Sequence, residues 1–365
     1  MTIIDNKHSI LYARNADFDV DQANRVQVVK MCQAFGENGH EITLLAFSKN
    51  PEKIRKRYNI KNYFQAIFIK QKINFFVLDD IVLFFLFLAK YKSFEYIYTR
   101  DITFALLVKL FFKKKKVFYE MHDVPKRCWW KFLHKKFSSK LDRVILISQG
   151  LKDGLLELGL NRTNFEILQD GVNLSEFDIP LSKEAARKKL ALPPEKIIVV
   201  YVGSTKEDRD IPALIETAKK MPSICFVIFG KDQKYIREAV NEMPNLIFKG
   251  YTDNPALAYS AADILFAGYT KKVPTINYMS PLKIFEYLAA KRPIIVADFP
   301  RIREVLDESE VYFYESENSY EIADKITEIM GNGHTANTKM LKAFDKVKKY
   351  TWKNRAKKII SLMQG

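Results

Sequence analysis

Short apolar segments alternate with amphipathic stretches along the whole chain, in two successive series. In the second series the apolar segments are almost unbroken runs of β-branched and aromatic residues, as expected of strands buried on both faces. These runs lie at residues 197–203, 224–230, 246–251, 263–268, 293–297 and 311–314. The strands expected in the first series lie at residues 9–12, 42–47, 66–69, 96–99, 117–121 and 144–148. The alternation predicts a doubly wound, mostly parallel α/β sheet in each series.

The intervals between the expected strands have the length and periodicity of helices. We expect the main helices at residues 22–38, 78–92, 104–112, 129–141 and 282–290. The composition changes at residues 170–194, where a polar stretch and a loop with two prolines separate the two series. Because 365 residues exceed the usual size of one hydrophobic core, the chain is expected to form two domains that divide within this stretch.

The positive charge of the chain is concentrated in its first half. The formal net charge is +16, and residues 1–175 hold 29 Lys or Arg against 18 Asp or Glu. A basic half indicates an anionic partner, which could be nucleic acid, an acidic membrane surface or a phosphorylated substrate. No nucleic-acid-binding motif accompanies the charge, so no nucleic-acid partner is expected.

Cations and aromatic residues are mixed around residues 111–136, as is typical of proteins at a lipid interface. The expected membrane contacts are Lys113, Lys114, Lys115, Lys116, Trp129 and Trp130. The alternative is a solvated turn whose aromatic residues fill the core. We favour contact with an anionic membrane surface.

Several protein classes lose support from what the sequence lacks. The three cysteines are far apart and form no CxxC pair, which argues against disulfides or a zinc site and fits a reducing compartment. The start of the chain has no apolar signal-peptide core, and the longest apolar run, residues 81–89, is about half the ~20 residues of a spanning helix. We therefore expect a cytoplasmic protein, at most peripheral on the inner face of the cell membrane. No GxxxxGK[ST], GxGxxG or GxSxG motif supports ATP, NAD or serine-hydrolase chemistry.

The window MSPLKIFEYLAAKRPIIVADFPRIR, residues 279–303, has the order loop, helix, buried strand. Pro281 is tolerated at a helix start, and the free N–H groups of a helix N-terminus suit a pyrophosphate. Glu286 follows Lys283 by about one turn and could accept hydrogen bonds from ribose hydroxyls. The alternative interpretation is an ordinary amphipathic helix that leads into a parallel strand.

The segment SPLKIFEYLAAKRPIIVA resembles the donor-binding signature of GT-B glycosyltransferases, specifically the retaining family four (glycosyl transferases group 1). The resemblance implies two Rossmann-like domains facing a cleft, with a closing helix that packs back on the first domain. The expected domains are therefore residues 1–170 with 350–365, for the acceptor, and residues 171–349, for the nucleotide sugar. Glu286 matches the second Glu of the family's Glu-x7-Glu motif, which holds the ribose, whereas Tyr278 stands where the first Glu is usual.

Two further windows match the family's pattern. In YVGSTKEDRD, Arg209 falls on the position of a phosphate-binding Lys and Ser204 on that of an Arg, with Lys206 near enough to substitute. The alternative is a solvated charged loop. In YEMHDVPKR, His122 follows an apolar strand and matches the family's histidine beside the donor sugar, although a lone His is more often structural. The complete set expected to bind the donor is Ser204, Lys206, Arg209, Lys231, Ser280, Pro281, Leu282, Lys283 and Glu286, with His122 as the catalytic candidate.

The first polar loop carries the spacing Asp17-x-Asp19-x-Asp21, which imitates metal motifs. Gln22 and Val28 stand where a calcium loop needs Gly and Glu, so calcium is not expected. The resemblance implies a reaction without a metal, and we expect no carboxylate–histidine cluster at the cleft. The loop residues Arg14, Asn15 and Asp19 are instead expected to shape the acceptor or phosphate side of the cleft.

The resemblance implies a retaining transfer of a sugar from a nucleotide-diphosphate sugar to an acceptor hydroxyl. The acceptor expected is a lipid-linked or cell-surface glycan, as in polysaccharide or lipopolysaccharide biosynthesis. No cofactor is expected besides the nucleotide sugar, which is a substrate. Two other classes stay open, namely a sugar-nucleotide epimerase of the same fold and a non-catalytic basic protein that binds membrane or nucleic acid.

Overall fold

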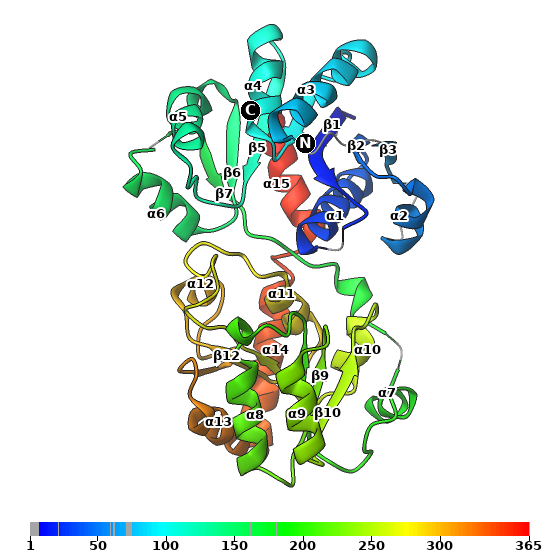
Figure 1. Cartoon of the computed structure of the whole chain (residues 1–365), viewed down its shortest axis with the longest axis vertical. Coiled ribbons are helices and arrows are strands. Elements are labelled where there is room, and N and C mark those ends of the chain that lie inside the picture. Colours follow the sequence, from blue (N-terminus) through cyan, green and yellow to red (C-terminus); the bar gives the residue numbers. More distant parts are fainter. Residues whose placement is uncertain are drawn as a thin grey trace, which may run out of the picture. The chain divides into compact units, whose positions relative to one another are not determined.

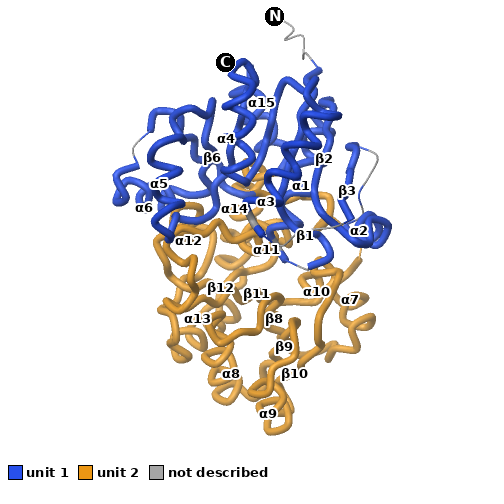
Figure 2. The backbone as a smooth tube through the Cα atoms, turned by 45° about the horizontal axis from the view of Figure 1, so that its top comes forward, with its two compact units in different colours: residues 1–170, 352–365 blue, residues 171–351 orange. Residues whose placement is uncertain are grey.

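The chain forms two compact units in a computed structural model, which describes residues 7–20, 22–58, 60, 63–70, 75–160, 162–179 and 181–364. Unit 1 comprises Met1–Asp170 and Trp352–Gly365, and unit 2 comprises Gly171–Thr351 (Figure 2). The two ends of unit 2 lie side by side, since Val172 and Thr351 form a parallel bridge. The chain therefore passes from one unit to the other twice, just after Asp170 and just before Trp352.

Unit 1 is built on a parallel sheet of seven strands in the order β3-β2-β1-β4-β5-β6-β7 (Figure 1). The strands are β1 (Ser9–Asp17), β2 (Glu41–Phe47), β3 (Gln65–Ile69), β4 (Tyr96–Thr99), β5 (Lys116–Met121), β6 (Arg143–Leu146) and β7 (Phe165–Ile167). The helices are α1 (Ala23–Glu37), α2 (Pro51–Arg57), α3 (Phe76–Leu86), α4 (Ile102–Phe111), α5 (Cys128–Phe137), α6 (Gln149–Glu157) and α15 (Trp352–Gln364). All six strands predicted for the first series are present. The prediction missed β7, because three half-buried residues at a sheet edge carry too short a pattern.

Strand β1 is longer than the sequence predicted. The polar residues from Arg14 to Asp17 were expected in a loop, but they continue the strand after a shift in register beyond Ala13. The buried Asn15 has polar partners inside the fold, since its backbone N–H donates to Asp101 and its side chain donates to Asp80 at 2.8 Å. Satisfied hydrogen bonds therefore let polar residues remain in a buried strand.

Helix α15 belongs to unit 1 and packs on α1. Its Arg355 is buried and donates to Glu120 at 3.0 Å and to the carbonyl of Gln169 at 3.0 Å. Glu120 lies on β5 and also accepts hydrogen bonds from Tyr98 and Gln27. The last helix is therefore joined to the middle of the first sheet by a buried ion pair.

Unit 2 is built on a second parallel sheet, of six strands in the order β10-β9-β8-β11-β12-β13. The strands are β8 (Ile198–Val202), β9 (Cys225–Phe229), β10 (Leu246–Gly250), β11 (Ile264–Ala267), β12 (Ile294–Ala297) and β13 (Tyr312–Tyr314). The helices are α7 (Lys183–Lys189), α8 (Ile211–Lys220), α9 (Lys234–Glu242), α10 (Pro255–Ser260), α11 (Leu282–Ala289), α12 (Pro300–Arg303), α13 (Ser319–Gly331) and α14 (Gly333–Val347). The six predicted strands are all present, and the central ones are fully buried, which explains their unbroken apolar sequences.

Both sheets confirm the predicted α/β class with two Rossmann-like domains. In each sheet the order reverses between two central strands, β1 and β4 in unit 1 and β8 and β11 in unit 2. Ligands of such sheets bind beyond the carboxyl ends of the strands at these reversals. Among the described residues, no helix combines the length and the apolar character needed to cross a membrane.

We expect Arg355→Met to destabilise unit 1 by about 3 to 5 kcal/mol, because it leaves the buried carboxylate of Glu120 without its counter-charge. The three tryptophans of the chain, Trp129, Trp130 and Trp352, all lie in unit 1, so urea unfolding followed by tryptophan fluorescence reports on this unit. The double variant with Glu120→Gln removes the uncompensated charge and should recover part of the loss. An unchanged unfolding midpoint for Arg355→Met would show that the pair does not hold α15 in place.

Candidate functional site

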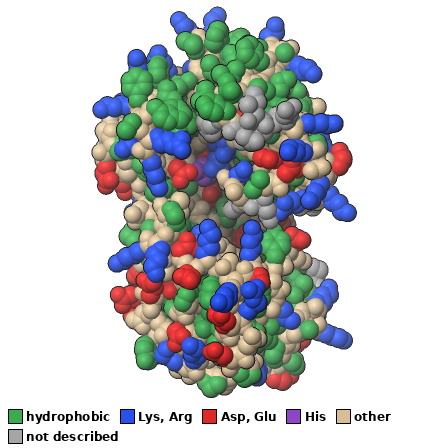
Figure 3. All heavy atoms as spheres, in the orientation of Figure 1, with side chains coloured by type: hydrophobic (Ala, Val, Ile, Leu, Met, Phe, Trp, Pro, Cys, Tyr) green, Lys and Arg blue, Asp and Glu red, His purple; other side chains and the backbone are tan. Residues whose placement is uncertain are grey.

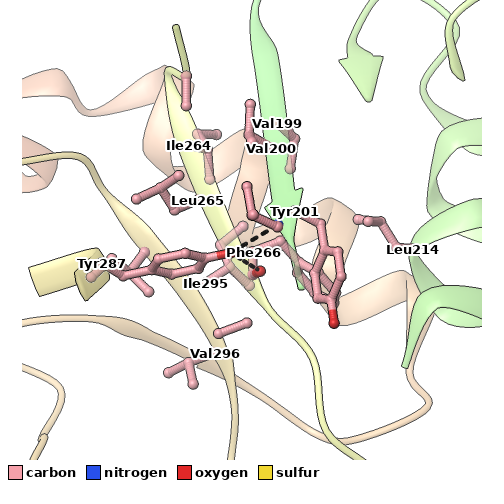
Figure 4. Packing of buried hydrophobic residues seen from close by; sticks show 14 of the residues in the cluster. Val199, Val200, Tyr201, Leu214, Ile264, Leu265, Phe266, Tyr287, Ile295 and Val296 are labelled. Atoms are coloured by element: carbon pink, nitrogen blue, oxygen red, sulfur yellow. Dashed lines mark hydrogen bonds between the residues drawn. The ribbon is translucent and has the colours of Figure 1, made fainter. Parts of the chain in front are cut away.

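The hydroxyl of Tyr287 fixes helix α11 to the carboxyl ends of the central strands of unit 2. The ladder between β8 and β11 has its last pair at Val200, so the two strands part beyond it. The buried Tyr287 hydroxyl lies between them, where it accepts from the N–H of Val202 at 3.3 Å and donates to the carbonyl of Phe266 at 3.1 Å (Figure 4). Helix α11 is therefore held next to the reversal of the strand order.

Helix α11 carries two of the predicted donor-binding residues, Lys283 and Glu286. The ammonium of Lys283 lies 3.8 Å from the centre of the Tyr201 ring, above the end of β8. Gly203 makes room for it, since a Cβ at this position would lie 2.6 Å from the Lys283 Nζ. Glu286 accepts a hydrogen bond from the hydroxyl of Tyr259 at 2.8 Å. Both charged groups are half-buried at the same end of the sheet.

Arg209 lies in the short helical turn Glu207–Arg209, just before α8. Its guanidinium is 5.7 Å from the centre of the Tyr269 ring and 3.4 Å from the Asp208 carboxylate. Among the described residues, its buried Nη1 has no hydrogen-bond partner. Asp210 holds the turn in a left-handed conformation, with φ of 56°, by accepting from Tyr314 at 2.7 Å and from the N–H of Glu317 at 2.9 Å.

The two cations are close enough to influence each other. Burial and the charge of Arg209 lower the pKa of Lys283 to about 7, although Glu286 acts in the opposite direction. Two half-buried cations, one paired only at 3.4 Å with Asp208 and the other with a lowered pKa, form a suitable site for a diphosphate, whose oxygens would restore the full charge on Lys283. The structure thus brings Arg209, Lys283 and Glu286 together as the sequence suggested.

The other predicted donor residues lie just beyond the ends of β8 and β9 and at the start of α11. Ser204, Lys206 and Lys231 are exposed and follow the ends of β8 and β9. The backbone of this region is fixed, because Tyr201 donates to the carbonyl of Ser204 and Thr205 donates to that of Lys231. The half-buried residues Ser280, Pro281 and Leu282 form the start of α11.

His122 lies in unit 1, two residues after Glu120 and just beyond the end of β5. Its Nε2 bonds to Glu120. Burial opposes ionisation of Glu120, but Arg355 and the His122 bond outweigh it and hold the carboxyl pKa well below its usual value. Burial and the charge of Arg100 lower the pKa of His122 well below its ordinary value. The imidazole is therefore neutral, with the proton on Nε2 and with Nδ1 as an acceptor.

A cavity of about 400 Å³ adjoins His122. Its lining includes three cations, Arg100, Lys126 and Arg127, together with Trp130 and His134 from α5. Trp130 was predicted to contact a membrane, but it is half-buried and lines this cavity, while Trp129, stacked on it at 4.0 Å, is 40% exposed. The cavity has the polar and aromatic lining that suits a sugar or phosphate group.

Unit 1 contains a carboxylate–histidine cluster that the sequence did not reveal. Glu120, His122 and Asp170 each place a ligand atom within 4.8 Å of the others. Asp170 is distant in sequence and joins the group only through the fold, and burial raises the pKa of its carboxyl to about 7. Arg355 already bonds to Glu120, so a metal ion in this place would have to compete with a guanidinium.

The loop residues predicted for the acceptor side have partners within unit 1. Arg14 pairs with Asp101, and the side chain of Asn15 is buried against Asp80. Asp19 accepts from Ser48 at 3.0 Å and from the N–H of Lys49 at 2.6 Å, so it ties the loop to the end of β2. The third carboxylate of the metal-like spacing, Asp21, lies outside the described residues.

The four lysines of the Lys113–Lys116 run differ in their exposure to solvent. Lys113 and Lys114 are exposed in the turn after α4. Lys115 is half-buried and donates to the carbonyl of Phe94 at 2.7 Å, and Lys116 begins β5. The first two lysines are therefore the ones available to a membrane surface.

Two family models match successive parts of the chain. The model described as Glycosyltransferase Family 4 matches residues 25–176, and the model described as Glycosyl transferases group 1 matches residues 182–353. Together with the two Rossmann-like sheets, these matches identify the class of protein. The chain belongs to the GT-B glycosyltransferases, with a family 4 domain followed by a group 1 domain.

Two named relatives align with part of the chain. A processive diacylglycerol alpha-glucosyltransferase of Acholeplasma laidlawii is 28% identical over 177 residues, which cover 46% of this chain and 51% of that protein. A putative teichuronic acid biosynthesis glycosyltransferase of Bacillus subtilis is 26% identical over 149 residues, which cover 40% of this chain and 37% of that protein. The chain thus spans about half the length of the first relative and less of the second.

Solved structures show the same fold over the full chain. A glycosyltransferase from Rickettsia africae has a TM-score of 0.80 at 15% identity, covering 98% of both chains. The Anabaena protein HepE in complex with UDP-glucose has a TM-score of 0.75 at 13% identity, covering 98% of this chain and 99% of that one. At these identities the likeness confirms the GT-B fold.

We predict that nucleotide-sugar binding takes up a proton at Lys283. With a pKa near 7, the free side chain is mostly neutral at pH 8 and must be charged to pair with a diphosphate. Calorimetry at pH 8 in HEPES and Tris buffers, which differ in ionisation enthalpy and contain no phosphate, should therefore show an uptake of about 0.5 to 1 proton, and affinity should fall as the pH rises above 7.

The ligand for this measurement is the one giving the largest thermal shift among UDP-, GDP- and ADP-sugars. Lys283→Arg serves as the control, because a guanidinium stays charged and its variant should bind without proton uptake. A binding enthalpy that is the same in both buffers for the wild type would contradict the assignment.

Proposed function

We propose that the chain transfers a sugar, with retention, from a nucleotide-diphosphate sugar to an acceptor hydroxyl. The observation that carries this proposal is the grouping of Arg209, Lys283 and Glu286 at the carboxyl ends of β8 and β11. A diphosphate bound between Arg209 and Lys283, with its ribose hydrogen-bonded to Glu286, would engage all three charged side chains. The family of the chain and the sugar nucleotide bound to HepE support this assignment.

In the proposed reaction the bond between the anomeric carbon and the β-phosphate oxygen breaks, and its electron pair stays on the diphosphate. Arg209 and Lys283 stabilise that developing charge, and electrostatic stabilisation of this kind supplies much of the rate acceleration in many enzymes. The acceptor oxygen bonds to the anomeric carbon from the same face and gives its proton to the leaving phosphate. His122 offers Nδ1 as an acceptor for a sugar hydroxyl, and this attack from the same face needs no nucleophile from the protein. The reaction proposed needs no divalent metal.

The proposed acceptor is a lipid-linked or cell-surface glycan, reached by docking on the inner face of the cell membrane. The names of the two relatives support it, since one acts on a diacylglycerol and the other is assigned to teichuronic acid biosynthesis. The charge of unit 1 supports it as well, because exposed lysines attract anionic lipid. A nucleic-acid partner is not part of the proposal.

We expect Glu286→Ala to weaken nucleotide-sugar binding by about 1.5 to 3 kcal/mol, the scale of a charge-assisted hydrogen bond. Tyr259→Phe is the matched control, because it removes the hydroxyl that bonds to Glu286 and keeps the carboxylate, so the loss should be smaller. Calorimetry measures both variants. Wild-type affinity in a folded Glu286→Ala protein would exclude the ribose role.

The same donor then serves an activity assay with EDTA present and with lipid or glycan acceptors. Labelled sugar should appear on the acceptor, and the donor incubated alone should keep its sugar unchanged. Isomerisation without an acceptor would favour the epimerase, and the absence of any nucleotide-sugar affinity would favour a non-catalytic protein. Activity that returns only with Mn²⁺ would contradict metal independence and direct attention to Asp170 and its neighbours.

We predict salt-sensitive binding to anionic vesicles through the exposed Lys113 and Lys114. At about 1 kcal/mol for each lysine, changing both to Gln should weaken co-sedimentation strongly, and binding should fade by about 0.5 M NaCl. The control variant Lys188→Gln/Lys189→Gln makes the same charge change at exposed positions of α7 in unit 2. Equal sedimentation with neutral vesicles would assign these lysines to another role.

A further inference from the structure

Unit 1 contains an apolar groove between α4 and α5 that the proposed sugar chemistry does not use. Its volume is about 620 Å³, within the range of sites that hold small molecules. The apolar lining consists of Leu106, Leu107, Leu110, Leu133 and Phe137. Thr103 and the three lysines Lys109, Lys113 and Lys140 complete the lining. The groove thus offers apolar walls together with cations.

The charged residues of the two segments that line the groove are all positive. Residues 102–119 contain five lysines and residues 124–141 contain six Lys or Arg, with no Asp or Glu in either segment. Lys109 is neutralised by Asp142 at 2.7 Å. Lys113 and Lys140 are exposed, and the Lys140 ammonium lies 5.0 Å from the centre of the Phe137 ring. A ligand that complements this groove is therefore apolar along its length and anionic at one end.

The surface next to the groove is also apolar. Leu110, Phe111 and Phe132 are 69%, 64% and 57% exposed, and Phe85 on α3 is 63% exposed. Figure 3 shows hydrophobic side chains gathered over α3 and α4, with Lys and Arg side chains at the margin. Contiguous exposed apolar side chains bordered by cations are typical of surfaces that enter the headgroup region of a membrane.

We propose that this groove binds one acyl chain of an anionic membrane phospholipid, whose phosphate lies at Lys113 and Lys140. The inference rests on the membrane docking proposed above and adds a defined contact to it. Anionic lipid attracts the positive charge of unit 1, and one lipid molecule also inserts an acyl chain into the groove. The groove adjoins the cavity of His122 along both helices: Thr103 and Leu133 line the groove, and Ile102 and His134 line the cavity. A lipid held here therefore lies next to the candidate sugar site of unit 1.

Alkyl phosphates below their micelle concentration test the groove without a membrane. Calorimetry with the full chain and hexyl, octyl and decyl phosphate should show affinity rising about fourfold for each methylene that the groove buries. Octyl glucoside, which has the same chain and a neutral headgroup, should bind at least about tenfold more weakly than octyl phosphate. Lys113→Gln and Lys140→Gln should each reduce octyl phosphate affinity about fivefold.

Leu110→Asp places a carboxylate in the groove at an exposed position and should reduce octyl phosphate affinity at least about tenfold. Leu156→Asp is the matched control, because Leu156 is an exposed leucine on α6 of the same unit outside the groove, and this variant should bind normally. Affinity that does not depend on chain length, or a normal Leu110→Asp variant, would overturn the proposal.

Two further outcomes separate this proposal from the docking proposal. Vesicle binding without alkyl phosphate binding would mean that charge alone holds the protein on the membrane, and the groove proposal would fall. Alkyl phosphate binding without vesicle binding would overturn the docking and, with it, a membrane phospholipid as the occupant, and would leave the groove as a site for a soluble alkyl phosphate. A concentration-dependent dimer that octyl phosphate does not dissociate would assign the groove to a second copy of the chain and also overturn the proposal.

Discussion

The buried hydroxyl of Tyr287 lies between two strands of unit 2 that no longer pair with each other. Without it, the N–H of Val202 would be unpaired in an apolar core, at a cost of about 1 to 3 kcal/mol. The same bond joins α11 to the strand ends, so it also determines where Lys283 and Glu286 lie. Stability and the geometry of the candidate donor site therefore depend on one satisfied polar group.

Unit 1 uses a buried ion pair in a comparable way. Arg355 from the last helix compensates the charge of Glu120, and Glu120 in turn holds the Nε2 of His122. The surroundings thereby determine the charge states of both candidate sites. Burial keeps His122 neutral, so its imidazole can accept a hydrogen bond from a ligand hydroxyl. Burial and a neighbouring cation lower the pKa of Lys283 to about 7, so its amine can take up a proton when an anionic ligand binds.

The basic segments of unit 1 have two different uses. Some cations are structural, as Lys115 is with the carbonyl of Phe94 and Lys109 is with Asp142. Others remain exposed beside apolar side chains around α4 and α5. A net charge alone does not distinguish these uses, because the partners of a long side chain are decided by the backbone that the fold places next to it.

The sequence by itself determined the two parallel sheets and the placement of Lys283 and Glu286 on α11. Unbroken apolar runs reveal buried strands, and Lys283 and Glu286 are one helical turn apart, so local periodicity is enough to place them side by side. It did not determine β7, whose three residues carry no pattern, or the continuation of β1 through Asn15. Only the tertiary structure paired Glu120 with Arg355, 235 residues away, added Asp170 to that cluster and placed Trp130 and His122 in the lining of one cavity. These contacts join segments that are distant in the chain, and strand order and helix packing, which no local pattern encodes, decide which side chains meet.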